Sequence, residues 1–182
     1  MKTLKPYLSL LALVAIGTLA GCSSSPTQAA DVSDSIRKAL DQAGLKDVSE
    51  TQDRDKGVVT LGGHVGAEND KSQAESIARS FAGRQVVSNQ IAVIPAGAES
   101  EAKAVNHDLD QGIEKNLDAA LIQNRFHDSV KYGVKNGVVT LTGDVESQSL
   151  RGQAASIAST VPNVQQVVNE LQVKRQKATS SN

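Results

Sequence analysis

The stretch Gly57-Val58-Val59-Thr60-Leu61 is repeated letter for letter as Gly137-Val138-Val139-Thr140-Leu141. The offset is 137 − 57 = 80 residues, and an echo without gaps continues at this offset over about forty residues, so the chain carries one small module twice. The repeat therefore decides the fold. The further identical pairs are Gly63 and Gly143, Val65 and Val145, Ala74 and Ala154, Ile77 and Ile157, Ala78 and Ala158, Asn89 and Asn169, and Val93 and Val173.

The same order of secondary-structure elements is predicted around each copy. Asn136-Gly137, and less clearly Lys56-Gly57, provide a tight hairpin turn, because glycine accepts a positive φ without steric cost. A weak strand precedes the turn, clearest as Val130, Tyr132 and Val134, and an alternating strand follows it. Next come a helix with apolar residues at i, i+3, i+4 and i+7 and a last alternating strand. The helix is expected to end at Gly83 in one copy and at Pro162-Asn163 in the other, since Gly and Asn best tolerate the left-handed conformation.

Each module is also expected to begin with an amphipathic helix. Asp31 or Ser33, and Asp108 or Asp110, are suitable N-caps for these helices. The fold class is therefore α+β, with two tandem α-β-β-α-β modules, each carrying two helices on one face of a three-stranded sheet. One core of about 65 residues is only marginally stable, so the copies are expected to pack on each other. The apolar stripes of the first helices are Val32, Ile36, Leu40 and Ala43, and Leu109, Ile113, Leu117 and Ala120.

The N-terminal residues resemble a bacterial lipoprotein signal. Lys2 and Lys5 precede the apolar run Leu8–Leu19, which is too short to span a membrane. Leu19-Ala20-Gly21-Cys22 resembles a lipobox, whose cysteine is acylated and becomes the first residue of the mature chain. The alternative is an ordinary signal peptide that contains Cys22. In lipoproteins an Asp after the cysteine usually signals inner-membrane retention, so Ser23 implies the inner leaflet of the outer membrane.

The domain organisation follows from these patterns. The predicted segments are a lipoprotein signal peptide at 1–21, a flexible tether at 22–30, a first module at 31–95, an Ala/Glu-rich linker at 96–106, a second module at 107–174 and a tail at 175–182.

Composition argues against several classes of partner and site. Without Lys2 and Lys5 the mature chain has 19 − 2 = 17 basic and 20 acidic residues, which argues against a nucleic-acid partner. Only three aromatic residues follow Cys22, so neither base stacking nor an interfacial aromatic belt is expected. Cys22 is the only cysteine, which excludes an intramolecular disulfide and a cysteine-based metal site.

The pattern G-V-V-T-L-x-G-x-V, a helix, then V-x-N-x-(L/I)-x-V resembles the BON domain of bacterial envelope proteins. The second copy is the better match, through Gly137–Val145 and Val161–Val173. The first copy departs from the pattern at Gly62-Gly63-His64 and at Ala82–Gln85. The resemblance implies a dual-BON envelope lipoprotein that binds phospholipid and supports envelope integrity, and it brings no catalytic residues.

The remaining polar motifs have structural interpretations. The glycines of Gly62–Gly66 are not followed by the Lys-Ser/Thr of a phosphate loop, so they are expected to serve backbone geometry. His64, His107 and His127 lack metal-ligand spacing, so neither a metal nor a cofactor is expected.

Asn89 and Asn169 place a polar side chain twice in an otherwise apolar strand phase. Each either hydrogen-bonds a nearby backbone group or contacts a ligand. No Ser-His-Asp, paired-carboxylate or nucleophile motif stands out, so an enzyme is not expected.

For lipid contact, the resemblance points to the first helix of the second module and the segment after it, from Asp110 to Phe126. Apolar side chains there would enter the acyl boundary while basic ones meet anionic head groups. The alternative is that the apolar residues cap the core and the cations are merely solvated, since the helix is also acidic. The lipid-binding candidates are Lys115, Ile122, Arg125, Phe126 and Lys131.

The sequence thus predicts a non-enzymatic, lipid-anchored outer-membrane protein that faces the periplasm. Its partner is an anionic phospholipid membrane, the second module takes the larger share of binding, and the role is envelope integrity under stress. The alternative is a periplasmic protein-binding or chaperone-like adaptor, merely tethered by its lipid, whose partners are outer-membrane or envelope proteins.

Overall fold

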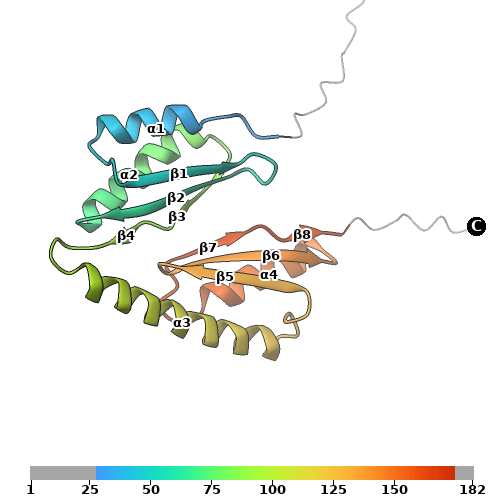
Figure 1. The fold of residues 1–182 in the computed structure, drawn as a ribbon. Coiled ribbons are helices and arrows are strands. Elements are labelled where there is room, and N and C mark those ends of the chain that lie inside the picture. Colours follow the sequence, from blue (N-terminus) through green and yellow to red (C-terminus); the bar gives the residue numbers. More distant parts are fainter. Residues whose placement is uncertain (1–27, 175–182) are drawn as a thin grey trace, which may run out of the picture.

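The computed structural model describes residues 28–174, and it confirms two tandem α+β modules (Figure 1). Cys22, the signal segment and the tail at 175–182 lie outside the described residues. Among the helices of residues 28–174, none combines the length and hydropathy needed to cross a membrane.

Module 1 contains α1 (Ser33–Gln42), β1 (Val48–Asp53), β2 (Val58–Val65), α2 (Glu68–Ala82), β3 (Val86–Asn89) and β4 (Ala92–Val93). Module 2 contains α3 (Glu99–Gln123), β5 (Val130–Lys135), β6 (Val138–Val145), α4 (Gln148–Ser159), β7 (Gln166–Asn169) and β8 (Gln172–Val173).

Each module is a small mixed sheet covered by two helices on one face. In module 1, β2 lies in the centre, antiparallel to β1 and parallel to β3, and the short β4 continues along β2. Module 2 repeats this order as β5-β6-β7 with β8. The predicted alternation is confirmed, because Val59 and Leu61 of β2, like Val139 and Leu141 of β6, are fully buried under the helices.

The last strand of each module is broken at the repeated asparagine. Asn89 Oδ1 accepts from the Ile91 N–H at 3.3 Å, while its Nδ2 donates to Glu75 Oε2 at 2.9 Å and to the Lys71 carbonyl at 3.4 Å. Asn169 likewise accepts from the Leu171 N–H and donates to a carbonyl of α4. The hydrogen bonds of both asparagines therefore support a structural role within their own module.

Two repeated glycines are required by backbone geometry. Gly63 and Gly143 both have positive φ, and a Cβ would collide with the carbonyl oxygen of Asp47 in one copy and of Ser129 in the other. This confirms a structural role for Gly63, because only glycine fits so close an approach of two backbones.

The first helices differ from the predicted alignment. Most of the Ala/Glu-rich linker at 96–106 is helical and continues directly into the first helix of module 2, because α3 runs without a break from Glu99 to Gln123. The buried stripe of α3 is Ile113, Leu117 and Leu121, so Leu121 corresponds to Leu40 at an offset of 121 − 40 = 81. The apolar stripe was therefore predicted one turn too early, and Leu109 is 44% exposed instead of buried.

The predicted N-caps are also wrong. The N-cap of α1 is Val32, with no side-chain cap, and Asp108 and Asp110 lie inside α3. The Asp110 carboxylate instead accepts from the N–H groups of Asn136 and Gly137 at 2.7 and 2.8 Å. It therefore stabilises the β5–β6 turn, where Gly137 has the predicted positive φ and Asn136 has a positive φ as well.

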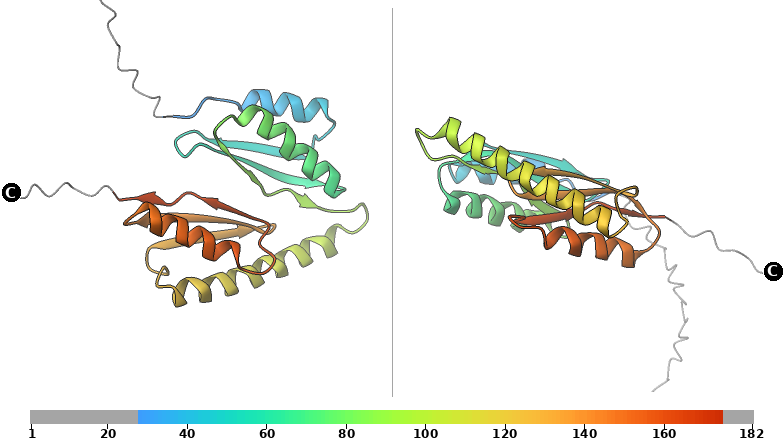
Figure 2. Two further views of the ribbon diagram at one scale, coloured as in Figure 1. Left: turned by 180° about the vertical axis from the view of Figure 1, so that it is seen from behind. Right: turned by 90° about the horizontal axis from the view of Figure 1, so that it is seen from below.

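The two modules pack on each other, as their size predicts. The two sheets lie between the helices of module 1 and those of module 2 (Figures 1 and 2). Val58 of module 1 forms a buried cluster with Val138 and Val168 of module 2, on the sheet faces that the helices leave open.

Polar contacts at this interface follow an approximate two-fold relation. Lys56 Nζ bonds Glu170 Oε2 at 2.7 Å, and Asn136 Nδ2 donates to the Gln90 carbonyl at 2.7 Å. The offset of 80 relates Lys56 to Asn136 and Gln90 to Glu170, so the same two positions meet twice. Such reciprocal contacts are typical of a symmetric dimer interface, here within one chain.

Candidate functional site

The candidate lipid-binding surface lies at the C-terminal end of α3. Ile122 is 54% exposed there, on the side of the helix away from the buried stripe. Lys115 lies two turns earlier on the same outer side and is also exposed. The structure thus brings together Ile122, Lys115 and the turn that follows α3.

Arg125 lies in this turn with an unusual backbone conformation. Its φ is +62°, and at the corresponding position after α1, module 1 has Gly44 with φ +79°. A left-handed conformation costs a non-glycine residue about 1–2 kcal/mol. The Arg125 side chain is also exposed. A strained arginine in place of glycine is an observation that points to a role for the side chain.

Phe126 is a core residue and not an exposed one, which corrects the prediction that it enters the acyl boundary. Its side chain is 6% exposed and belongs to the core of module 2. Its N–H donates to the Leu121 carbonyl at 2.8 Å, and its carbonyl accepts from Val130 at 2.9 Å. In module 1, Leu45 makes the equivalent contact with Leu40 and is also buried. Phe126 therefore closes the core after the helix, the alternative that the sequence left open.

Lys131 is exposed but separate from the α3 surface. It follows Val130 on β5, where alternate residues Val130 and Tyr132 face the core, so Lys131 points from the opposite face of the sheet. The set that the structure groups together is therefore Lys115, Ile122 and Arg125.

Acidic groups lie beside this surface. Asp118 Oδ1 is 3.2 Å from His127 Nδ1. Burial, and after it the neighbouring Asp118 carboxylate, raises the pKa of Tyr132. A hollow of about 210 Å3 between the α3 turn and α4 is lined by Arg125 on one side and by Asp144 and Glu146 on the other. The surface is therefore mixed in charge, and Ile122 and Arg125 are its distinctive members.

The histidines do not form a site. His127 pairs with Asp118, His107 contacts Gln111 at 2.9 Å, and His64 is exposed on module 1. Within residues 28–174, no group of three or more His, Cys, Asp or Glu side chains is arranged to hold a metal ion.

The structure contains a groove between the modules that the sequence did not predict. The groove has a volume of about 510 Å3 and is lined by Lys71 and Pro95 of module 1 and by Leu109 and Asn136 of module 2, among others. Val105, one turn before Leu109, is also exposed. The sequence signal for this surface is the apolar Leu109, which the helical periodicity places in the core.

Comparison with known proteins identifies the family. The model of the BON domain matches residues 27–95 and 109–175. The chain is 30% identical over 142 residues to osmotically-inducible protein Y of Escherichia coli (strain K12), covering 76% of this chain and 69% of that protein.

Two solved structures are also similar. Both are of CdsD, a structural protein of the type III secretion system of Chlamydia trachomatis. For its C-terminal domain the TM-score is 0.33 at 13% identity, with 78% of this chain and 67% of that chain covered. For the second structure the TM-score is 0.32 at 17% identity, with 80% and 93% covered. Similarity this low carries no argument about function.

Proposed function

The chain belongs to the BON-domain family, and from that premise we propose that it is a non-enzymatic envelope lipoprotein that binds anionic phospholipid. It is acylated at Cys22, is held in the inner leaflet of the outer membrane, and supports envelope integrity under stress. Module 2 takes the larger share of lipid contact, through Lys115, Ile122 and Arg125.

The observation that carries the proposal is Arg125 beside the exposed Ile122. An isoleucine that enters the acyl boundary, next to a cation at head-group level, is the arrangement of interfacial helices. Arg125 also has a positive φ at the position where the other module has glycine, and a strained residue of this kind is typical of functional positions.

An NMR titration of the fragment that starts at Ser23 tests this surface. With phosphatidylglycerol micelles we expect chemical-shift changes concentrated from Lys115 to Lys131 and suppressed by salt, and zwitterionic micelles are the control. Absence of shifts specific to the anionic micelles contradicts the proposal and leaves the acyl group as the membrane contact.

The variant Arg125→Gly separates binding from folding. Each basic contact at an anionic surface contributes about 1 kcal/mol, so vesicle affinity should fall roughly fivefold. Glycine relieves the positive φ, so the free energy of unfolding should stay constant or rise by up to about 1 kcal/mol. Lys46→Gly, at an exposed loop residue of module 1, is the matched loss of one cation.

The second candidate function is the protein-binding adaptor. The observation that favours it is the groove between the modules, which the exposed Leu109 lines, with Val105 exposed one turn earlier on α3. An adaptor would retain a specific envelope protein at high salt, and Leu109→Ser would abolish that retention while leaving vesicle binding unchanged.

A further inference from the structure

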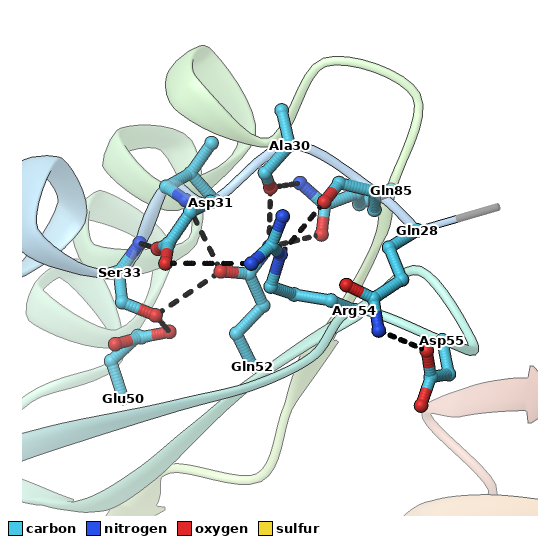
Figure 3. A network of polar contacts seen from close by, with 11 residues as sticks. Gln28, Ala30, Asp31, Ser33, Glu50, Gln52, Arg54, Asp55 and Gln85 are labelled. Carbon is cyan, nitrogen blue, oxygen red and sulfur yellow. Dashed lines mark hydrogen bonds and ion pairs between the residues drawn. The ribbon is translucent and has the colours of Figure 1, made fainter. Parts of the chain in front are cut away.

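The segment at residues 28–32, which leads into module 1, is hydrogen-bonded to the β1–β2 hairpin. Ala29 and Arg54 exchange two hydrogen bonds, from the Ala29 N–H to the Arg54 carbonyl at 2.8 Å and from Arg54 Nε to the Ala29 carbonyl at 2.9 Å. The Ala30 carbonyl accepts from Gln52 Nε2 at 2.7 Å and from Gln85 Nε2 at 3.1 Å. Figure 3 shows these side chains converging on the strap, residues 28–32. The last residues of the expected tether are therefore fixed on module 1.

This strap limits how far module 1 lies from an anchor at Cys22. Gln28, whose Nε2 donates to Asp55 Oδ1 at 2.8 Å, is 28 − 22 = 6 residues from Cys22. Six residues span at most about 20 Å when fully extended. If Cys22 is acylated, the surface around the strap stays within that distance of the bilayer.

The surface around the strap is apolar and basic. Phe81 at the end of α2 is 42% exposed and lines a hollow of about 650 Å3 together with Gln28–Ala30. Charged residues of this lining are Arg54, Lys56 and Arg84 against Asp55, a net charge of 3 − 1 = +2. Lys56 also pairs with Asp53 and Glu170, and Arg54 pairs with Asp31. An exposed aromatic side chain that lines one hollow with Arg84 matches the boundary between head groups and acyl chains of an anionic membrane.

The same corner of module 2 is built differently. Val161, at the position that corresponds to Phe81, is 6% exposed and belongs to the core. Val164 stands there where module 1 has Arg84, and it lines the groove between the modules. The shared fold therefore requires neither a large exposed aromatic side chain nor a cation at this corner.

The two surfaces lie at one end of the molecule. In Figure 1 the strap and the C-terminal end of α3 are both on the right, and in the reversed view of Figure 2 both are on the left. One flat membrane at this end can therefore face both the strap of module 1 and the C-terminal end of α3 in module 2.

We propose that Phe81 and Arg84, the tether patch, rest on the same anionic bilayer that holds the acyl group, so that module 1 is a second membrane contact. This inference rests on the proposed lipid anchor. The strap and the short tether keep the patch within about 20 Å of the membrane surface, and the end of α3 lies toward the same end of the molecule.

Tryptophan fluorescence tests the tether patch, because the chain contains no tryptophan. The full-length acylated variants Phe81→Trp, Ile122→Trp and Val105→Trp are reconstituted singly into vesicles of phosphatidylcholine and phosphatidylglycerol with brominated acyl chains. We expect a blue shift and quenching at positions 81 and 122. At Val105, which is exposed on the far half of α3, we expect neither. Arg84→Trp repeats the test at a second exposed position of the patch.

The outcomes separate this inference from the proposed function. Quenching at 122 but not at 81 or 84 overturns the tether patch and leaves the α3 surface intact. No quenching at any position overturns both. Equal quenching at 105 means a molecule without fixed orientation and also overturns the inference. A blue shift at 81 that is present before vesicles are added, and is unchanged by them, means that the chain itself covers Phe81, which overturns it too.

Discussion

Module 1 and module 2 place the same residues at the same points of their sheets, yet they differ where their helices end. After the first helix, module 1 has Gly44 and module 2 has Arg125, both with positive φ. After the second helix, module 1 exposes Phe81, whereas the corresponding Val161 is buried. The identical residues maintain the fold, so roles that belong to one module alone are to be sought at the positions where the copies differ.

The interface between the modules shows the same division. Two contact positions keep the approximate two-fold relation, but Gln166 breaks it. Its Nε2 donates to the Val87 carbonyl at 2.7 Å and its Oε1 accepts from the Asn89 N–H at 3.0 Å. The corresponding residue of module 1 is Val86, which is exposed. Module 2 therefore makes, through Gln166, a polar contact with the edge strand β3 of module 1, and module 1 makes no matching contact through Val86.

The largest effect is expected from the shared glycines. Gly63→Ala and Gly143→Ala each force a Cβ into a backbone carbonyl at a positive φ, so each should lower the free energy of unfolding by about 3 kcal/mol. Denaturant unfolding followed by circular dichroism measures this. Gly152→Ala in α4, where a Cβ meets open space, is the control and should be neutral or stabilising. A mild effect in one copy only would show that the frameworks are not equivalent.

The next effect is expected from Gln166→Val, which gives module 2 the residue of module 1. The variant leaves the Val87 carbonyl and the Asn89 N–H without the partner they have now, at residues that are almost fully buried. A loss of about 2 kcal/mol follows, because unsatisfied buried groups lose their hydration without compensation. The reverse change, Val86→Gln, is the control and should have little effect. Equal effects of the two changes would contradict the asymmetry.

How far the sequence predicts this molecule depends on the kind of interaction. The module order, the positive φ of Asn136-Gly137 and the buried strand residues follow from local patterns that both copies repeat. The stripe of α3 was misplaced by one turn because the offset in the first helices is 81 and not the 77 that matched Leu109 with Val32. The apolar positions of an amphipathic helix recur every turn, so two such helices can be aligned equally well after a shift of one turn. Periodicity alone therefore does not fix which residues of the two first helices correspond.

The rest depends on residues far apart in the sequence. Asp110 was a plausible N-cap by its type, but the turn at Asn136 that its carboxylate binds lies 26 residues away. The strap on Arg54 and the groove between the modules have no local signature either. For the candidate site, the exposure of Ile122 follows from its place on the helix, whereas the burial of Phe126 depends on how the chain turns after α3.

A third prediction concerns pH, through a contact that module 2 lacks. Burial acts to raise the pKa of Glu75, but the hydrogen bond from Asn89 and the pair with Arg79 outweigh it, so the pKa lies below its ordinary 4.5. Because the folded-state pKa is lowered, this stability is present above pH 4.5 and is lost as the pH falls through the folded value. Module 2 has Ala155 at this position.

Hydrogen exchange of each module, measured at neutral pH and below pH 4.5, checks this. Glu75→Gln should destabilise module 1 by about 1 kcal/mol at neutral pH, and the difference from the native chain should vanish in acid. Amides of α4 should not respond to the substitution at either pH. A difference that persists in acid would mean that the charge of Glu75 is not the cause.

The smallest effect is expected at Lys56. Lys56 and Asn136 occupy equivalent positions of the interface, but they make different kinds of polar contact. Its ammonium pairs with Glu170 at 2.7 Å, while the corresponding Asn136 donates to a carbonyl. Since Lys56 is partly exposed, Lys56→Gln should cost less than about 1 kcal/mol. The hydrogen bond with Glu170 raises the pKa of Lys56 above 10.5, so the contribution is complete below that pH and disappears as the pH rises through the folded value. Urea unfolding at neutral and at high pH measures both effects, and high salt should reduce the difference at neutral pH. If Lys56→Gln costs as much as Gln166→Val, the interface depends on its ion pair and not on the amide that pairs with the edge strand.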